Sequence, residues 1–328
     1  MTPRASAPDA PSVPLIAIVG PTASGKSALG VFLAEQLGGE VVACDSTQLY
    51  RGFDIGTAKP TRAERHGIPH HLLDVLSPEE EATAGAYRRM ALEVLFDLRR
   101  RARLPVFTVG TGLYLRALLE GLADAPERSA ELRERLRASA SRRAPGHLHR
   151  VLKRLDPEAA AHIAPGDEQK LIRAMEVCVL SQRSLSEVYR AGRAPLQGWH
   201  ALKIGLLPPR EALYARIGAR VAAMLERGWL EEVQRLLAAG LPKNSKPFDF
   251  IGYRELHAHL QEKLSLVDAV ASITQATRRY AKRQITWFRR EHGVHWLESC
   301  GDEPATQQAA LSWVRIQLTA PPAAPKGV

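Results

Sequence analysis

The sequence has few cysteines, no long apolar run and no excess of acidic residues. Its three cysteines, Cys44, Cys178 and Cys300, are far apart and form no CxxC pair, which argues against a disulfide framework and a cysteine zinc site. No segment approaches the roughly 18 apolar residues of a membrane span, and the first residues lack the apolar core of a signal peptide. These absences predict a cytoplasmic protein without membrane association.

The chain is instead basic. Its 328 residues carry 45 Lys and Arg against 35 Asp and Glu, a net charge of +10. This balance favours a polyanionic partner, above all nucleic acid, although a solubility bias with arginine-rich coding would give the same charge. Residues 1–13 and 319–328 have the composition of disordered tails, and a monomer is the default expectation.

One motif stands out. Residues 20–27 read GPTASGKS and fit G-x-x-x-x-G-K-[ST], the phosphate-binding P-loop. An apolar run at residues 15–19 predicts a buried strand before it, and residues 28–37 have helical apolar spacing after it. This context argues against a chance match in a Gly-rich turn. Backbone N–H groups of such a loop bind anions at a helix N-terminus; Lys26 would reach phosphate oxygens and Ser27 would help to hold Mg²⁺.

The P-loop indicates which group is held, but it does not indicate which bond breaks. A kinase uses this loop to hold nucleotide phosphates. An enzyme that displaces diphosphate from carbon would use it to hold the leaving group, because both reactions need charge stabilisation on oxygen.

Strand and helix patterns alternate through the first third of the chain. We predict strands at residues 41–44 and 105–109, and helices at residues 85–103 and 113–119. This alternation predicts an α/β fold with a P-loop NTPase-like parallel sheet core. Ligands bind at the carboxyl ends of such strands. The P-loop, Asp45 and Thr111 all follow predicted strands and should therefore converge on one crevice.

The pattern becomes helical near residue 123. Residues 128–154 contain nine Arg and Lys against two acids, and a strand pattern returns at residues 202–207. We predict a helical insertion domain at residues 123–199 that splits a core of residues 14–122 and 200–318; a continuous helical half is the alternative.

A second basic segment lies near the C-terminus. Residues 277–290 carry six basic residues and no acid, with Tyr280, Trp287 and Phe288 between them. A cationic helix face suits a phosphate backbone. Equally, the aromatic side chains could be ordinary core residues, with the arginines on a solvated face.

Six segments resemble one known family, the bacterial tRNA dimethylallyltransferases, also called tRNA isopentenyltransferases. They occur in family order: GPTASGKS (20–27), CDSTQLYRGFDIGTAKP (44–60), GTGLYLRALLEGL (110–122), DEQKLIRAMEV (167–177), FIGYRE (250–255) and AKRQITWFR (281–289). The resemblance implies transfer of the dimethylallyl group of dimethylallyl diphosphate to N6 of adenosine 37, next to the anticodon, in tRNAs reading codons that begin with U. It also implies Mg²⁺ as cofactor, release of diphosphate, and a helical insertion that grips the anticodon stem-loop.

The resemblance also assigns catalytic roles. The amine is a poor nucleophile, so a carboxylate that takes its proton is useful, and Asp45 matches the family's aspartate; a helix-capping or Mg²⁺-binding Asp is the alternative. Thr111 would contact the diphosphate or the target nucleotide, unless it is a simple helix N-cap. Lys26 and Arg220, with Arg216 as a further candidate, would meet the diphosphate, although spacing alone favours a solvated helix surface for both arginines.

The remaining site residues are carried over by motif position. The predicted diphosphate-binding residues are Gly20, Pro21, Thr22, Ala23, Ser24, Gly25, Lys26 and Ser27. The predicted tRNA-binding residues are Asp45, Ser46, Thr47, Gln48, Thr111, Arg133, Gln169, Lys170, Leu171, Ile172, Arg173, Asp249, Phe250, Ile251, Gly252, Tyr253, Arg254, Lys282, Arg283, Gln284, Ile285, Thr286, Trp287, Phe288 and Arg289.

Two other interpretations compete. A P-loop small-molecule or nucleoside kinase explains the loop and a base at Asp45, but it leaves both basic segments unexplained. An RNA-binding module explains the charge, but it gives Asp45 and Thr111 no role.

Overall fold

The computed structural model describes residues 12–242 and 245–319. The chain divides into two compact units. The core unit comprises residues up to Leu119 and from Gln197, and the helical unit comprises Glu120–Leu196. The predicted insertion boundary at residue 199 is too late, because Trp199 is the first residue of a strand in the core unit.

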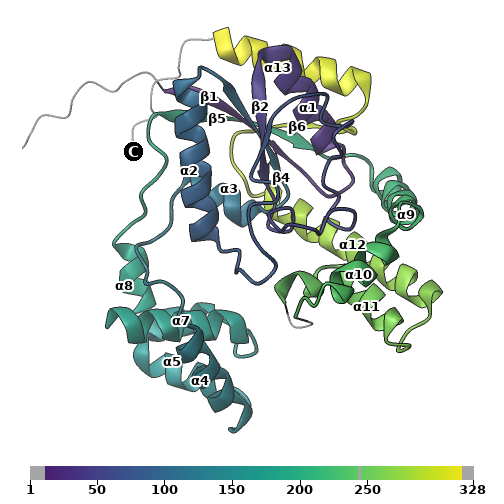
Figure 1. Cartoon of the computed structure of the whole chain (residues 1–328). Coiled ribbons are helices and arrows are strands. Elements are labelled where there is room, and N and C mark those ends of the chain that lie inside the picture. Colours follow the sequence, from purple (N-terminus) through teal and green to yellow (C-terminus); the bar gives the residue numbers. More distant parts are fainter. Residues whose placement is uncertain (1–11, 243–244, 320–328) are drawn as a thin grey trace, which may run out of the picture. The chain divides into compact units, whose positions relative to one another are not determined.

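Six strands of the described residues form one parallel sheet in the core unit (Figure 1). They are β1 (Val13–Val19), β2 (Gly39–Cys44), β3 (His70–His71), β4 (Leu104–Val109), β5 (Trp199–Leu206) and β6 (Val294–Leu297). The order is β3-β2-β4-β1-β5-β6 and every pair is parallel. The predicted α/β class is confirmed. Cys44 lies opposite Val109, and Ile18 opposite Thr108, so β2, β4 and β1 end at one edge.

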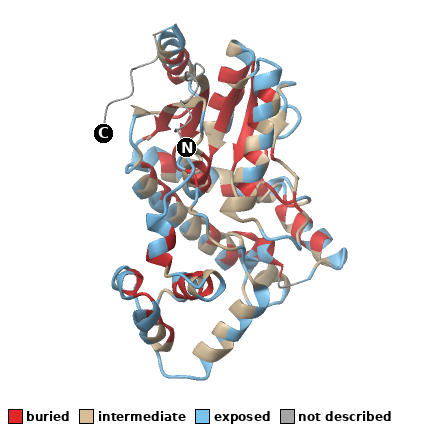
Figure 2. Ribbon diagram, turned by 90° about the vertical axis from the view of Figure 1, so that its left-hand side faces the viewer, coloured by how far each residue is buried: buried red, intermediate tan, exposed pale blue. Residues whose placement is uncertain are grey.

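Helices cover the sheet because its strands are apolar on both faces. Helix α1 (Lys26–Leu37) packs with α13 (Pro304–Thr319), and α2 (Ala84–Arg100) packs with α3 (Gly112–Leu119). Ile16 and Ile18 of β1 lie in the core cluster beneath α1 and α13. Side chains alternate along a strand, so Leu15 and Ala17 face the other side, where they are also fully buried. Figure 2 shows the buried strands between partly exposed helices.

Further helices of the core unit follow β5. They are α9 (Arg210–Glu226), α10 (Trp229–Ala238), the 3₁₀ turn η1 (Lys246–Asp249), α11 (Tyr253–Leu260) and α12 (Leu266–Phe288). Leu213 and Ile217 of α9 pack on Ala281 of α12. Phe53, in the loop after β2, packs against the rings of Phe248 and Tyr253. These contacts hold the group of helices from α9 through α12 beside the carboxyl edge of the sheet.

The regular elements described in the helical unit are all helices. They are α4 (Ala130–Ser141), α5 (His147–Leu155), α6 (Pro157–His162), α7 (Glu168–Ser181) and α8 (Leu185–Arg190). Leu152 and Leu171 belong to its own apolar core. Buried Asp156 accepts hydrogen bonds from the backbone of Ala159 and Ser186, which joins α5, α6 and α8. This unit therefore has the separate core that a domain requires.

Several predicted boundaries were wrong. The first helix begins at Lys26, two residues before the predicted start, and α2 ends at Arg100 because the chain must turn before β4. The short strand β3 was not predicted, since two histidines have no apolar pattern. Val13 begins β1 and Thr319 ends α13, so neither belongs to a tail; residues 1–11 and 320–328 lie outside the described residues. No helix among the described residues is long and apolar enough to cross a membrane.

Candidate functional site

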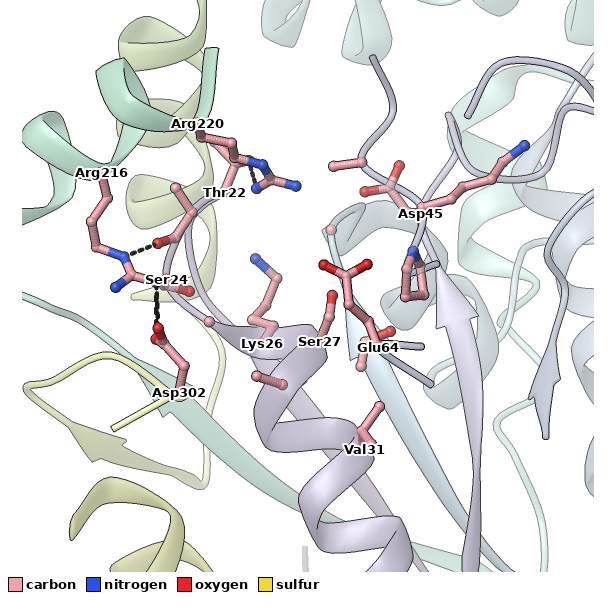
Figure 3. Close-up of a pocket in the computed structure, with 18 of the residues that line it drawn as sticks. Thr22, Ser24, Lys26, Ser27, Val31, Asp45, Glu64, Arg216, Arg220 and Asp302 are labelled. Carbon is pink, nitrogen blue, oxygen red and sulfur yellow. Dashed lines mark hydrogen bonds and ion pairs between the residues drawn. The ribbon is translucent and has the colours of Figure 1, made fainter. Parts of the chain in front are cut away.

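A cavity of about 810 Å³ opens at the carboxyl ends of β1, β2 and β4 (Figure 3). The P-loop from Thr22 to Ser27 lines it, together with Asp45 after β2 and Gly110 after β4. Residues from α9 and α12 complete the wall. Both helices come much later in the sequence than the P-loop and Asp45. The structure thus brings the predicted P-loop and Asp45 together in one crevice, as the strand order requires.

The P-loop has the geometry of an anion site at the start of α1. Gly25 is the N-cap residue, with φ at 83°, a conformation that glycine adopts without strain. Lys26 Nζ donates to the carbonyl oxygens of Gly20, at 3.0 Å, and Pro21, at 2.6 Å. Burial lowers the pKa of Lys26 to about 7, with Asp45 opposing and Arg220 adding to the shift. A bound anion would favour the charged form of Lys26.

Asp45 lines the cavity, and its two carboxylate oxygens have different neighbours. Its Oδ1 accepts hydrogen bonds from Thr47 N, at 2.9 Å, and Thr47 Oγ1, at 2.8 Å. Its Oδ2 lies against Gly110, where a β-carbon would come within 1.9 Å of it. Glycine at this position therefore makes room for the carboxylate, and Thr47 fixes its rotation.

Thr111 supports the same edge. Its hydroxyl accepts from Ser46 N, at 3.0 Å, and donates to Ser46 Oγ, at 3.2 Å. The N–H groups of Gly110 and Thr111 both donate to Cys44 O, each at 3.0 Å. In this structure the hydroxyl therefore ties the end of β4 to the segment that begins with Asp45.

Two arginines of α9 reach the P-loop, so spacing alone was a poor guide to their environment. Arg220 lines the cavity and donates to Thr22 Oγ1 at 3.4 Å. Burial and the neighbouring Arg227 lower its pKa, although it keeps its charge. Arg216 donates to Ala23 O at 3.0 Å and pairs with Asp302, at 2.8 and 2.9 Å. Both arginines line the cavity, and Figure 3 shows Arg216 held between Ala23 of the P-loop and Asp302.

The predicted tRNA-binding residues fall into three groups. Some are buried in their own unit: Leu171, Ile172, Gly252, Tyr253, Gln284 and Phe288. Others are exposed: Gln169, Lys170, Asp249, Arg254, Lys282, Arg283, Thr286 and Arg289. The rest are partly buried: Asp45, Ser46, Thr47, Gln48, Thr111, Arg133, Arg173, Phe250, Ile251, Ile285 and Trp287. Arg133 and Arg173 both pair with buried Glu176. Their contacts with tRNA stay a prediction.

Sequence reasoning missed residues that shape the cavity. Lys59 is buried, donates to Tyr50 O at 2.5 Å and forms ion pairs with Asp54 and Asp74, which fixes the loop after Asp45. It stands in the GTAKP motif, so a signal existed. Glu64 also lines the cavity, but it lies in no motif that would have indicated it.

The cavity residues fit a phosphate-bound Mg²⁺ better than a site built from protein ligands alone. The described residues contain no cluster of three His, Cys, Asp or Glu side chains suited to a metal ion. Ser27 is exposed in the first turn of α1 and lines the cavity. Mg²⁺ often keeps waters and takes phosphate oxygens with only one or two protein ligands, a role that Ser27 suits.

Two family models match the chain. The model described as IPP transferase matches residues 48–291, and the one described as isopentenyl transferase matches residues 13–78. Together they span the P-loop, Asp45, the helical unit and α12.

Curated relatives cover almost the whole chain. The tRNA dimethylallyltransferase of Solibacter usitatus is 50% identical, over 92% of this chain and 98% of that protein. That of Koribacter versatilis is 52% identical, with the same coverage.

Solved structures agree with these relatives. The tRNA isopentenylpyrophosphate transferase of Bacillus halodurans has a TM-score of 0.69 and 35% identity, over 93% of this chain and 96% of that one. A eukaryotic dimethylallyltransferase acting on tRNA has a TM-score of 0.81 and 26% identity, over 96% of this chain and 82% of that one. A family model matches most of the chain, and curated relatives are identical at about half of the aligned residues. The chain therefore belongs to the IPP transferase family.

Proposed function

We propose that this protein transfers the dimethylallyl group of dimethylallyl diphosphate to N6 of adenosine 37 in tRNAs that read codons beginning with U. The observation that carries the proposal is that the P-loop and the carboxylate of Asp45 line the same cavity. The names of the relatives support prenyl transfer to tRNA, and they do not favour the kinase alternative.

Asp45 would act as the general base. The N6 lone pair attacks the first carbon of the dimethylallyl group, and the bond from that carbon to the diphosphate oxygen breaks. The electron pair of that bond leaves with the diphosphate, and the proton of the amine passes to Asp45. Its Oδ1 is held by Thr47, so Oδ2 is the oxygen placed to accept the proton.

The leaving diphosphate would be stabilised by the P-loop amides, Lys26 and Arg220. These groups lie on one side of the cavity and are positioned before the reaction, which is the arrangement that stabilises developing charge at little reorganisation cost. Ser27 would hold Mg²⁺, whose charge offsets that of the diphosphate when bound.

The target base must leave the RNA stack to reach Asp45, as in other enzymes that modify bases. The exposed basic residues of α12 suit contact with RNA phosphates. These residues are Arg278, Arg279, Lys282, Arg283, Arg289 and Arg290. The anticodon stem-loop is the proposed partner, and the basic helical unit is proposed to bind it as well. We further propose a cytoplasmic monomer whose P-loop, which also resembles an ATP site, holds the prenyl donor.

One incubation tests the proposal. Purified protein is mixed with Mg²⁺, labelled dimethylallyl diphosphate and unmodified tRNA carrying adenosine at position 37. Label should appear on that adenosine, and Asp45→Asn, which keeps an acceptor for Thr47, should abolish transfer while tRNA binding survives. A tRNA with guanosine at position 37 is the matched control. Absence of label with tRNA-binding wild-type protein, or ATP consumption instead, would refute the transferase assignment.

A further inference from the structure

Gln284 connects two sides of the cavity from the inner face of α12. The side chain is 6% exposed and lines the cavity wall. Its Oε1 accepts from Thr22 N at 2.7 Å, and its Nε2 donates to Gly110 O at 2.8 Å. The first contact joins residues 262 positions apart in the sequence and the second joins residues 174 apart.

The two partners belong to opposite parts of the site. Thr22 lies in the P-loop, and Gly110 is the residue against which the Asp45 carboxylate rests. Tyr280, one turn earlier on α12, also donates to Gly110 O, at 3.3 Å. The distance from the phosphate loop to the base is therefore set through α12 as well as through the sheet.

Both ends of the Gln284 amide are occupied by backbone groups. Its oxygen accepts from Thr22 N and its nitrogen donates to Gly110 O. Turning the amide towards an RNA base would break both hydrogen bonds and leave Thr22 N without this partner. This burial distinguishes it from Lys282 and Arg283, which precede it on the same helix and are exposed.

We propose that Gln284 is a positioning residue that sets the spacing between the phosphate loop and Asp45, and that it does not contact RNA. This role rests on the proposed function, because it concerns how the donor is presented to the base. Thr22 N, held by Gln284, orients the loop so that Thr22 Oγ1 meets Arg220. Loss of the amide would release the P-loop and Gly110 from each other without touching the basic face of α12.

The test uses Gln284→Leu, which keeps the volume and removes both hydrogen bonds. Inorganic diphosphate with Mg²⁺ is titrated by calorimetry, and the KM values for dimethylallyl diphosphate and tRNA are measured separately. We expect diphosphate affinity to fall about tenfold, as for the loss of one to two buried hydrogen bonds. The donor KM should rise and kcat should fall, while tRNA affinity and tRNA KM stay unchanged. Gln275→Leu, the same change at an exposed position of α12, should alter none of these.

A second variant keeps the proposal testable if Gln284→Leu does not fold. Tyr280→Phe removes only the hydroxyl contact with Gly110 O, so kcat should fall about threefold with diphosphate affinity unchanged. The role of Gln284 is overturned if Gln284→Leu weakens tRNA binding and spares the donor KM, or if it behaves like wild type and Tyr280→Phe does too. Wild-type protein that binds diphosphate but transfers no prenyl group would overturn the proposed function alone, whereas failure to bind diphosphate would overturn both.

Discussion

Gly110→Ala is the change that tests most directly whether the position of Asp45 governs transfer. The new β-carbon would lie 1.9 Å from Oδ2, 2.8 Å from Cγ and 3.3 Å from Cβ of Asp45. Ordinary contact begins near 3.4 Å, so the carboxylate must move by about 1.5 Å. Gly110 is not among the residues with positive φ, so the backbone accepts alanine and the whole effect is steric.

The expected cost follows from this displacement. A misplacement of about 1 Å at a reacting centre can lower the rate about 100-fold, which corresponds to about 2.7 kcal/mol of activation free energy. We therefore expect the single-turnover rate of prenyl transfer to fall about 100-fold in Gly110→Ala. Diphosphate affinity, measured by calorimetry, should change little, because the P-loop side of the cavity is untouched.

Gly218→Ala provides the matched control. This glycine lies within α9, and a β-carbon there would meet no heavy atom within 4 Å. Alanine favours a helix interior over glycine by about 1 kcal/mol, so the control should be at least as stable as wild type and equally active. A Gly110→Ala protein that melts normally and transfers at the wild-type rate would refute the argument that Asp45 must stand where it does.

Three further predictions address the P-loop support, the RNA face and the acid stability of the fold. Arg216→Ala should raise the donor KM more than Asp302→Ala, because Arg216 also holds Ala23 O; additive effects in the double variant would show that the pair does not act as a unit. Four exposed basic residues of α12 are replaced together by alanine: Arg278, Arg279, Lys282 and Arg283. This variant should bind tRNA more weakly, and its affinity should depend less on salt concentration. An unchanged salt dependence would show that this face of α12 does not contact RNA phosphates. The pKa of Glu40 is lowered to about 2, chiefly by Arg101, so the stability that this carboxylate contributes is present above pH 4.5 and is lost as the pH falls towards 2. Arg101→Met should therefore lower the unfolding free energy at pH 7 and have less effect near pH 2; denaturant curves that match wild type at pH 7 would contradict this.

The sequence was sufficient for those parts of the site that depend on local order. A strand, a glycine-rich turn and a helix start within eight residues make the P-loop, and the chain order of strands and helices predicts a parallel sheet. Because parallel strands end at one edge, the strand order predicted from the sequence places Asp45 beside the P-loop. Thr111 was predicted by the same reasoning, and the structure places it one residue from the cavity wall, bonded to Ser46.

The rest depends on long-range packing that no local pattern encodes. Arg220 is spaced like a surface residue of an amphipathic helix, and only the packing of α9 against α12 brings it to Thr22. Asp302 follows β6, lines the same cavity and pairs with Arg216 beside the P-loop. Neither contact leaves a periodicity in the sequence, because each joins segments from different thirds of the chain.

Helix α12 shows most clearly why one motif can combine two roles. Successive residues of a helix point in directions about 100° apart, so AKRQITWFR distributes its side chains around the axis. Ala281, Gln284 and Phe288 recur at three and four residues and are buried, whereas Lys282, Arg283 and Thr286 are exposed. Residues 282–289 of this motif were all predicted to bind tRNA. The buried residues of the motif nevertheless form an inner face of α12 that supports the donor site. Substitutions on that inner face should change the kinetics of the prenyl donor, and substitutions on the outer face should change the affinity for tRNA.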